Sequence, residues 1–295
     1  MAGKWAINEE FLQQVETLQM LIKNNVAGLF GGNHKSKTYG SSCEFADYRE
    51  YTAGDDVMKI DWNAFARFDK LYLKLFLDER QMHTRIYIDG SRSMAYGGSK
   101  KAEQAIKLAA AFAYLSVCEM DKVSIYLMRN KELIEVIGGM VGKEAYTSSI
   151  HKLNEITFDG DCCISDCIVP SKVGYGDGLS IILSDFLTDD DYETAIDLLA
   201  GKKRDAFCVQ ILSKEEIEPT VRGKVHFFDS ENANKFYRKN IDRDIARAYA
   251  RALEYSIDRI RNYCNARGAQ YMQVRAGESL NKIFLEKLVD MGVLK

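Results

Sequence analysis

The sequence predicts an α/β fold, a three-layer sandwich in which helices pack on a mostly parallel central sheet. Short apolar runs rich in β-branched residues alternate along the chain with longer segments whose apolar residues recur at helical spacing. Two of these runs, 86–88 and 179–183, are followed by oxygen-bearing side chains and then by a predicted helix. Because ligand sites in such folds lie at the carboxyl ends of parallel strands, we expect the functional edge there.

The first part of the chain predicts a helix followed by a loop. Asn8 is a suitable N-cap for a helix over 9–26, whose apolar residues fall on one face. Glycine and basic residues over 28–37 predict a flexible basic loop, because the glycine–lysine spacing of a phosphate-binding loop is absent.

The segment 40–67 is polar and aromatic, has no helical period, and places acids beside arginines throughout. This composition predicts a rigid network of ion pairs and hydrogen bonds around Tyr51 and Trp62. Perturbed charges do gather at functional sites, but a structural role for such a network is the commoner one.

The remaining elements follow from the same periodicities. The pattern predicts strands over 71–77, 86–88, 123–128, 133–137, 179–183, 207–212, 224–228 and 271–274, and helices over 100–120, 143–156, 189–202, 238–267 and 280–294. Gly268 is a suitable stop for the long helix that precedes it.

The stretch 84–94 holds the candidate site. Asp89 ends a buried strand, and Ser91 and Ser93 follow at alternate positions of the loop that leads to the next helix. Asp185 follows the run 179–183, so it could face Asp89 at the edge of the sheet. Hard oxygen ligands of this kind suit Mg²⁺ or Mn²⁺. The alternative is a solvated serine-rich turn in which Asp89 only caps a helix.

Composition limits the classes of partner and location. The 295 residues carry a formal net charge of −3, which argues against nucleic acid as the main partner. The sequence has no apolar stretch long enough to span a membrane and no signal peptide at its start. Its seven cysteines follow no regular framework, so we expect a reduced, cytoplasmic protein.

Three of the cysteines gather at positions 162, 163 and 167. A zinc site would need a second pair of ligands, and the four histidines are scattered along the chain. A nucleophilic cysteine would need a histidine partner that the sequence does not place. We therefore expect free, buried thiols.

The motif Asp89-Gly-Ser91-Arg-Ser93 resembles the DxSxS signature of the metal-ion-dependent adhesion site in von Willebrand factor A domains. Asp185 matches the later aspartate of that family. Cys162 stands where the family places a threonine, and a thiol is a poor ligand for a hard cation. The resemblance implies a von Willebrand factor A-like, Rossmann-like fold and a metal site at Asp89, Ser91, Ser93 and Asp185.

Residues 44–67 closely resemble the hallmark of the bacterial family called "domain of unknown function 58". The family pattern runs Glu-Phe, Arg-x-Tyr, Pro-Gly-Asp-Asp, Arg-x-Ile-Asp-Trp and Ala-Arg, and here Ala53 replaces the proline and Met58 the first residue of the fourth block. The likeness extends over roughly 28–290. We divide the chain into an N-terminal helix and signature segment packed on the main domain (1–83), a von Willebrand factor A-like domain (84–230) and a C-terminal helical extension that completes it (231–295).

The resemblance implies a non-enzymatic adaptor whose adhesion-type site docks an acidic residue of a partner, bridged by Mg²⁺ or Mn²⁺ where the metal is present. Members are typically encoded near MoxR-type AAA+ ATPases, so the implied partner is such an ATPase or its client. Two alternatives stay open. One is a metal-dependent hydrolase that uses the same acids, and the other is a structural domain with a degenerate, empty metal site.

Overall fold

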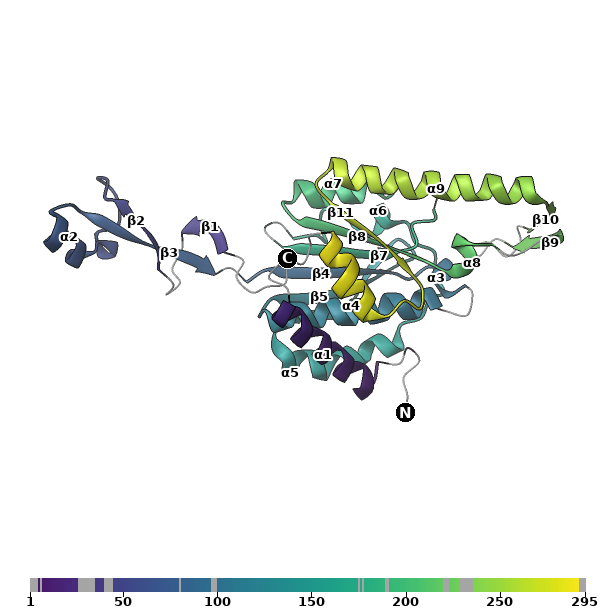
Figure 1. Cartoon of the computed structure of the whole chain (residues 1–295), viewed down its shortest axis with the longest axis horizontal. Coiled ribbons are helices and arrows are strands. Elements are labelled where there is room, and N and C mark those ends of the chain that lie inside the picture. The colour runs from purple at the N-terminus through teal and green to yellow at the C-terminus, as the bar shows by residue number, and fades with distance from the viewer. Residues whose placement is uncertain are drawn as a thin grey trace. The chain divides into compact units, whose positions relative to one another are not determined.

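A computed structural model describes residues 5, 7–25, 35–39, 45–79, 81–96, 100–174, 176, 178–188, 191–219, 223–228 and 236–291 (Figure 1). The chain divides into two compact units. Residues 1–30 and 82–295 form the larger unit, and residues 31–81 form a second unit, named here the signature unit because it contains the segment 44–67. Each unit is described by itself.

The larger unit is built on a six-stranded sheet with the strand order β11-β8-β7-β4-β5-β6. Five strands run parallel, and β6 pairs antiparallel with β5 at one edge. All six residues of β7 are buried, as expected for a parallel strand covered on both faces. The strands are β4 (His83–Asp89), β5 (Lys122–Arg129), β6 (Glu132–Met140), β7 (Leu179–Ser184), β8 (Asp205–Leu212) and β11 (Gln270–Arg275).

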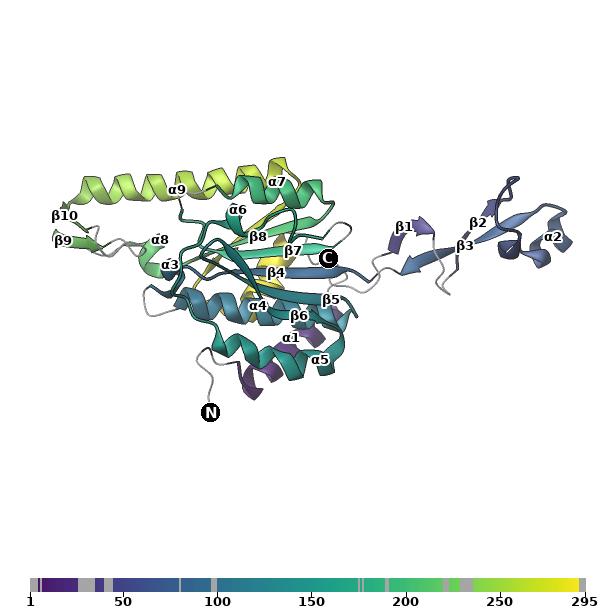
Figure 2. The ribbon, with the colours of Figure 1, turned by 180° about the vertical axis from the view of Figure 1, so that it is seen from behind.

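Helices cover both faces of this sheet (Figure 1, Figure 2). One hydrophobic core includes α1 (Glu9–Asn25), α4 (Lys100–Cys118), α5 (Gly142–Ser149) and the C-terminal turns α10 (Leu280–Lys282), η3 (Ile283–Lys287) and α11 (Leu288–Asp290). The opposite core includes α6 (Ile164–Cys167), α7 (Glu193–Gly201) and α9 (Arg243–Ala266). The predicted three-layer α/β sandwich with a mostly parallel sheet is confirmed.

Helix α4 lies at the centre of the first core. Fifteen of its nineteen residues are buried, and its many alanines allow the helix to approach the sheet closely. Phe112 is 0% exposed, and its ring lies 5.9 Å from that of Phe207 on β8 and 4.9 Å from that of Phe284. The predicted helix over 100–120 ends at Cys118 because Met120 takes a left-handed backbone conformation (φ 62°).

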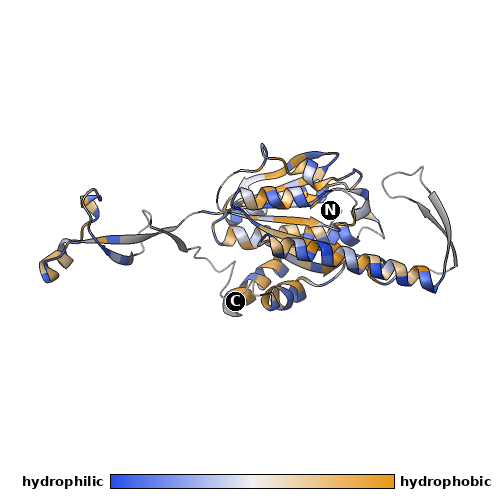
Figure 3. Ribbon diagram, turned by 90° about the horizontal axis from the view of Figure 1, so that it is seen from above, coloured by the Kyte–Doolittle hydropathy of each residue, from blue (hydrophilic) through white to orange (hydrophobic). Residues whose placement is uncertain are grey.

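The long helix predicted over 238–267 is wrong at its start. Strand β10 (Phe236–Ile241) pairs antiparallel with β9 (Gly223–Phe228), and α9 begins only at Arg243. Asp242 separates the two elements because its carboxylate accepts hydrogen bonds from the backbone N–H groups of Asp244 and Ile245. Along α9, hydrophilic and hydrophobic residues are interspersed, as Figure 3 shows.

Two other predicted helices are present but differ from the prediction, one in helix type and one in its start. The helix predicted over 143–156 is α5, which continues as the tighter helical turn η2 (Ile150–Glu155). The helix predicted over 189–202 is α7, and residues 189 and 190 lie outside the described part of the chain.

The signature unit contains a three-stranded antiparallel sheet with the order β1-β3-β2. Its strands are β1 (Lys35–Tyr39), β2 (Phe45–Glu50) and β3 (Tyr72–Glu79), and its helical turns are η1 (Val57–Lys59) and α2 (Trp62–Phe68). The loop predicted over 28–37 is therefore wrong at its end, and 28–34 lie outside the described residues. Helix α2 was not predicted, and Asp61 starts it by accepting hydrogen bonds from the N–H groups of Asn63 and Ala64.

The predicted boundaries at 1–83, 84–230 and 231–295 differ from these two units, which comprise 1–30 with 82–295 and 31–81. The apolar stripe of α1 belongs to the core of the larger unit, and β11 from the C-terminal segment completes its sheet. Packing of the signature segment on the main domain stays a prediction. No helix among the described residues is both long and apolar enough to cross a membrane.

Replacing Phe112 with alanine tests the central position of α4. We expect the free energy of unfolding to fall by about 3–5 kcal/mol, because the change leaves a cavity between Phe207 and Phe284. Urea unfolding followed by circular dichroism measures this loss. The control is Lys107→Ala, which removes only a partly exposed ion pair to Glu103 on the same helix, with an expected change of about 0.5 kcal/mol. Equal effects of the two substitutions would contradict the assignment.

Candidate functional site at the carboxyl edge of the sheet

The site lies where the order of the strands reverses. Strand β4 has β5 on one side and β7 on the other, and Asp89 and Asp185 stand at the carboxyl ends of β4 and β7. This is the position at which open α/β sheets bind ligands. Gly90 follows Asp89 in a tight space, since a β-carbon there would lie 2.9 Å from the carbonyl oxygen of Met128.

Asp89 is almost fully buried, with 4% of its surface exposed. Its Oδ1 accepts a hydrogen bond from the backbone N–H of Ser91 at 2.9 Å, and its Oδ2 accepts one from the hydroxyl of Ser184. Burial raises the pKa of Asp89, and the nearby charge of Asp185 raises it further. The charged form of Asp89 is therefore stabilised by the hydrogen bonds from Ser91 and Ser184.

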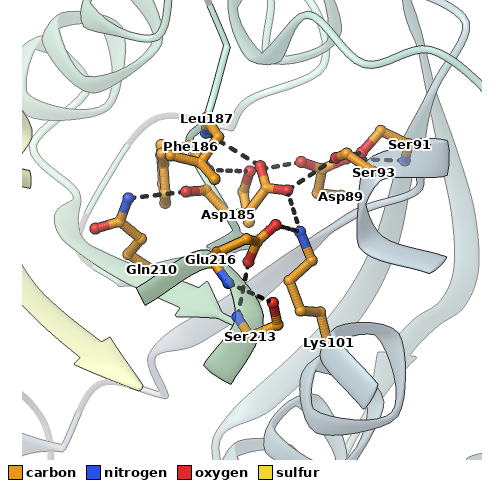
Figure 4. A network of polar contacts seen from close by, with 11 residues as sticks. Asp89, Ser91, Ser93, Lys101, Asp185, Phe186, Leu187, Gln210, Ser213 and Glu216 are labelled. Atoms are coloured by element: carbon orange, nitrogen blue, oxygen red, sulfur yellow. Dashed lines mark hydrogen bonds and ion pairs between the residues drawn. The ribbon is translucent and has the colours of Figure 1, made fainter. Parts of the chain in front are cut away.

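A chain of hydroxyl groups connects the loop after β4 to Asp185. The hydroxyl of Ser93 donates to Oδ2 of Asp185 at 2.9 Å, and the hydroxyl oxygens of Ser91 and Ser93 lie 2.9 Å apart. The backbone N–H of Leu187 donates to the other carboxylate oxygen of Asp185 at 3.1 Å. The structure thus brings together Asp89, Ser91, Ser93 and Asp185, the four residues predicted from the sequence (Figure 4).

Lys101 is the site residue that sequence reasoning missed. Its Nζ lies 2.8 Å from Oδ2 of Asp185 and 2.5 Å from Oε1 of Glu216, and its side chain is 1% exposed. Burial alone would lower the pKa of Lys101, but the charges of Asp185 and Glu216 and their hydrogen bonds outweigh it, so the pKa is raised. A charged ammonium group is therefore buried beside the predicted metal ligands.

Glu216 is fixed by its own short helix. It lies in α8 (Lys214–Ile217), where Ser213 and Glu216 form a reciprocal capping box. One carboxylate oxygen of Glu216 accepts from the backbone N–H of Ser213, while the other faces Lys101. Glu216 therefore links the end of β8 to the start of α4.

The loop that carries Cys162 lies against the Asp89 loop. The N–H of Arg92 donates to the carbonyl oxygen of Gly160 at 3.0 Å. Cys162 is 6% exposed and interacts with Asp89, so it occupies the neighbourhood in which the sequence placed the family's threonine. A hydrogen bond with Cys167, burial and the charge of Asp89 all raise the pKa of the Cys162 thiol. Cys162 and Cys167 are free, buried cysteines as predicted, whereas Cys163 is only partly buried.

The arrangement fits the predicted Mg²⁺ or Mn²⁺ poorly. One oxygen of Asp185 is already in contact with an ammonium group, which would repel a second cation. The thiol of Cys162 interacts with Asp89 where the resemblance implies a threonine oxygen, and hard cations disfavour a thiol ligand. Among the described residues, no group of three or more histidine, cysteine, aspartate or glutamate side chains is placed to hold a metal ion.

The polar network predicted for the signature unit exists, but it centres on Asp61 and Asp55 rather than on Tyr51 and Trp62. Asp61 accepts a hydrogen bond from the hydroxyl of Tyr48 at 2.8 Å and pairs with Lys74 at 3.3 Å. Asp55 pairs with Arg49 at 2.7 Å and accepts from the hydroxyl of Thr52. The Tyr48 hydrogen bond, with those from the α2 backbone, lowers the pKa of Asp61 to about 2.

This network holds a set of exposed apolar side chains, named here the signature surface. Its exposed fractions are high for large apolar residues, reaching 90% for Met58, 66% for Phe68 and 62% for Trp62. The rings of Trp62 and Phe65 pack edge to face with centroids 6.3 Å apart. The members of the signature surface are Val57, Met58, Trp62, Phe65 and Phe68.

The larger unit is a mixed α/β domain that carries two acids where the order of its parallel strands reverses. The profile of the family described as "Protein of unknown function DUF58" matches residues 47–257, and the chain belongs to this family. The chain is 22% identical to the uncharacterized protein Rv1480 of Mycobacterium tuberculosis (strain ATCC 25618 / H37Rv), over 74% of this chain and 70% of that protein. The same values hold for the uncharacterized protein Mb1516 of Mycobacterium bovis.

Two solved structures are similar over most of the chain. The SpRpn10 VWA domain matches with a TM-score of 0.38 and 11% identity, over 70% of this chain and 95% of that one. An uncharacterized membrane spanning protein from Vibrio fischeri matches with a TM-score of 0.22 and 13% identity, over 71% of this chain and 98% of that one.

Replacing Tyr48 with phenylalanine tests the network around Asp61. We expect the pKa of Asp61 to rise from about 2 toward the ordinary 3.8, because the phenol hydrogen bond to the charged carboxylate is lost. Since the folded pKa is depressed, the stability that the carboxylate contributes is present above about pH 4 and is lost as the pH falls toward 2. Titration of the aspartate carboxyl carbons by NMR measures the shift. The control is Tyr255→Phe on α9, and an unchanged Asp61 pKa in Tyr48→Phe would contradict the assignment.

Proposed function

We propose that this chain is a non-enzymatic adaptor that binds a protein partner through the signature surface. The observation that carries the proposal is the exposure of Met58, Trp62 and Phe68. Large apolar side chains exposed within one short segment commonly mark a protein-interaction site. Tryptophan and other aromatic side chains supply much of the binding energy in such interfaces.

The polar contacts beneath the signature surface support this role. Asp61 is 5% exposed and starts α2, which carries Trp62, Phe65 and Phe68. The ion pairs of Asp55 and Asp61 fix the chain on either side of Val57 and Met58. A surface fixed in this way loses little conformational freedom when a partner binds, which favours affinity.

The proposed partner is a MoxR-type AAA+ ATPase or one of its clients. Family membership supports this choice, because such proteins are typically encoded near these ATPases. Von Willebrand factor A-like domains are also often protein-interaction modules. The adaptor would position the ATPase for the assembly or remodelling of another protein.

The carboxyl edge would contribute a second contact through its rim rather than through its acids. Asp89 and Asp185 are at most 4% exposed, so a partner reaches neither directly. Tyr96 is 68% exposed and Leu187 is 37% exposed, and Arg92 is also exposed. All three residues lie close in sequence to Asp89 or Asp185. Bridging by a divalent cation is not part of this proposal.

The double substitution of Trp62 and Phe68 by alanine tests the signature surface. We expect capture of the purified ATPase to weaken at least ~10-fold, because each large aromatic contact in a binding hot spot contributes about 1–2 kcal/mol or more. Surface plasmon resonance with the full chain immobilised measures the affinity. The control is Tyr255→Ala, which removes an aromatic residue that is 73% exposed on α9.

Two results would count against this proposal. Unchanged affinity of a correctly folded double variant would exclude the signature surface as the ATPase site. A large loss of stability of the larger unit in the double variant would instead identify that unit as what covers the surface. Thermal unfolding of both variants separates the second result from the first.

A further inference from the structure

We infer that Lys101 is a built-in cation that takes the place of the divalent metal at the carboxyl edge, and that its removal turns this edge into a Mg²⁺ or Mn²⁺ site. The inference goes beyond the proposed adaptor function, because it concerns the charge balance of the larger unit with or without a partner. The inference predicts that Mg²⁺ and Mn²⁺ neither bind nor stabilise the natural chain. It also predicts that they bind and stabilise a chain without Lys101.

The geometry places the ammonium group among the acids that would otherwise need a metal. Nζ of Lys101 lies 2.8 Å from Asp185 and 2.5 Å from Glu216, which are charge-assisted hydrogen-bond distances. Oδ2 of Asp185 receives both this ammonium group and the Ser93 hydroxyl. Oδ2 of Asp185 is therefore already occupied by the Lys101 ammonium group and by the hydroxyl of Ser93, one of the predicted metal ligands.

Pairing with Asp185 and Glu216 keeps this buried lysine charged. Lys101 and Gln104 are both buried in the first turns of α4, and the Lys101 side chain is 1% exposed. Side chains of lysine are rarely buried unless they are paired with acids, because burying an unpaired charge is costly. Burial removes the hydration of the Lys101 ammonium group. Its pairing with Asp185 and Glu216 offsets this cost and at the same time compensates the charge of these carboxylates.

The remaining charges explain why removal of Lys101 would create a metal site. Asp185 and Glu216 would then lose the cation that they share, while the hydroxyl oxygens of Ser91 and Ser93 remain close to Asp185. Carboxylate and hydroxyl oxygens are the ligands that Mg²⁺ prefers, and it retains waters in its other positions. The Cys162 thiol would leave one such position to water.

The consequence for recognition is specific. In an adhesion-type site the metal is reached by an acidic group of the partner, which completes its coordination. An ammonium group that is 1% exposed and already paired with two carboxylates offers no such open position. Recognition at this edge is therefore independent of divalent cations and does not use an acid from the partner.

The test compares the full-length natural chain with Lys101→Met in MgCl₂, MnCl₂ and EDTA. Isothermal titration should show no saturable binding of either ion by the natural chain, and its Tm should be the same in EDTA and in millimolar MgCl₂. Lys101→Met should bind one ion per chain, and its Tm should be lowered in EDTA and raised by ~4 °C or more on addition of MgCl₂.

Two further variants serve as matched controls. Lys101→Arg keeps the positive charge and should bind no metal, whereas Lys107→Met removes a lysine from an exposed pair on the same helix and should behave like the natural chain. Lys101→Gln keeps a hydrogen-bond donor without the charge and replaces Lys101→Met if that variant does not fold in EDTA.

Either of two results would overturn the inference. Saturable Mg²⁺ binding by the natural chain with a matching rise in Tm would show that the edge accepts a metal despite Lys101. Failure of both Mg²⁺ and Mn²⁺ to bind or stabilise the neutral variants would show that Lys101 is not a substitute for a metal. Neither result depends on the ATPase, so this test and the test of the signature surface fail separately.

Discussion

Two carboxylates buried at the ends of neighbouring parallel strands impose the main physical constraint on the larger unit. Asp89 and Asp185 are 4% and 3% exposed, and a buried charge is costly unless it is paired or hydrogen-bonded. Donors from separate segments offset this cost, among them the hydroxyls of Ser93 and Ser184 and the ammonium group of Lys101. The loops, the start of α4 and α8 are therefore tied to one another through these two acids.

The fold was largely predictable because its strongest signals are local. Each buried strand is a short apolar run, and each main helix has an apolar face, so the order of the elements fixes an α/β sandwich. The prediction failed at 238–241, where Ile241 continues the helical period of Ile245 and Tyr249. Pairing with β9 and the cap at Asp242 decide this region, and strand pairing depends on contacts that helical periodicity does not record.

The candidate site was predictable only in part, for the same reason. Asp89 and Asp185 each end a strand, so the topology of a parallel sheet was enough to bring them together. Lys101 gave no signal, because a lysine in the first turn of a helix is usually solvated. Its partner Glu216 lies 115 residues further along the chain, and their contact depends on how α4 and α8 approach the same strand ends. Spacing within the sequence cannot show that approach.

Two features of this edge disfavour a divalent cation. Cys162 places a thiol beside Asp89, and Lys101 supplies positive charge at Asp185. A thiol alone would leave a metal with one ligand fewer, and an ammonium group alone would compete with the metal at one acid. The acids remain a buried, hydrogen-bonded support for the loops, and Lys101 offsets part of their negative charge. In the proposed function, partner recognition would use exposed groups, of which the signature surface offers the largest apolar set among the described residues of its unit.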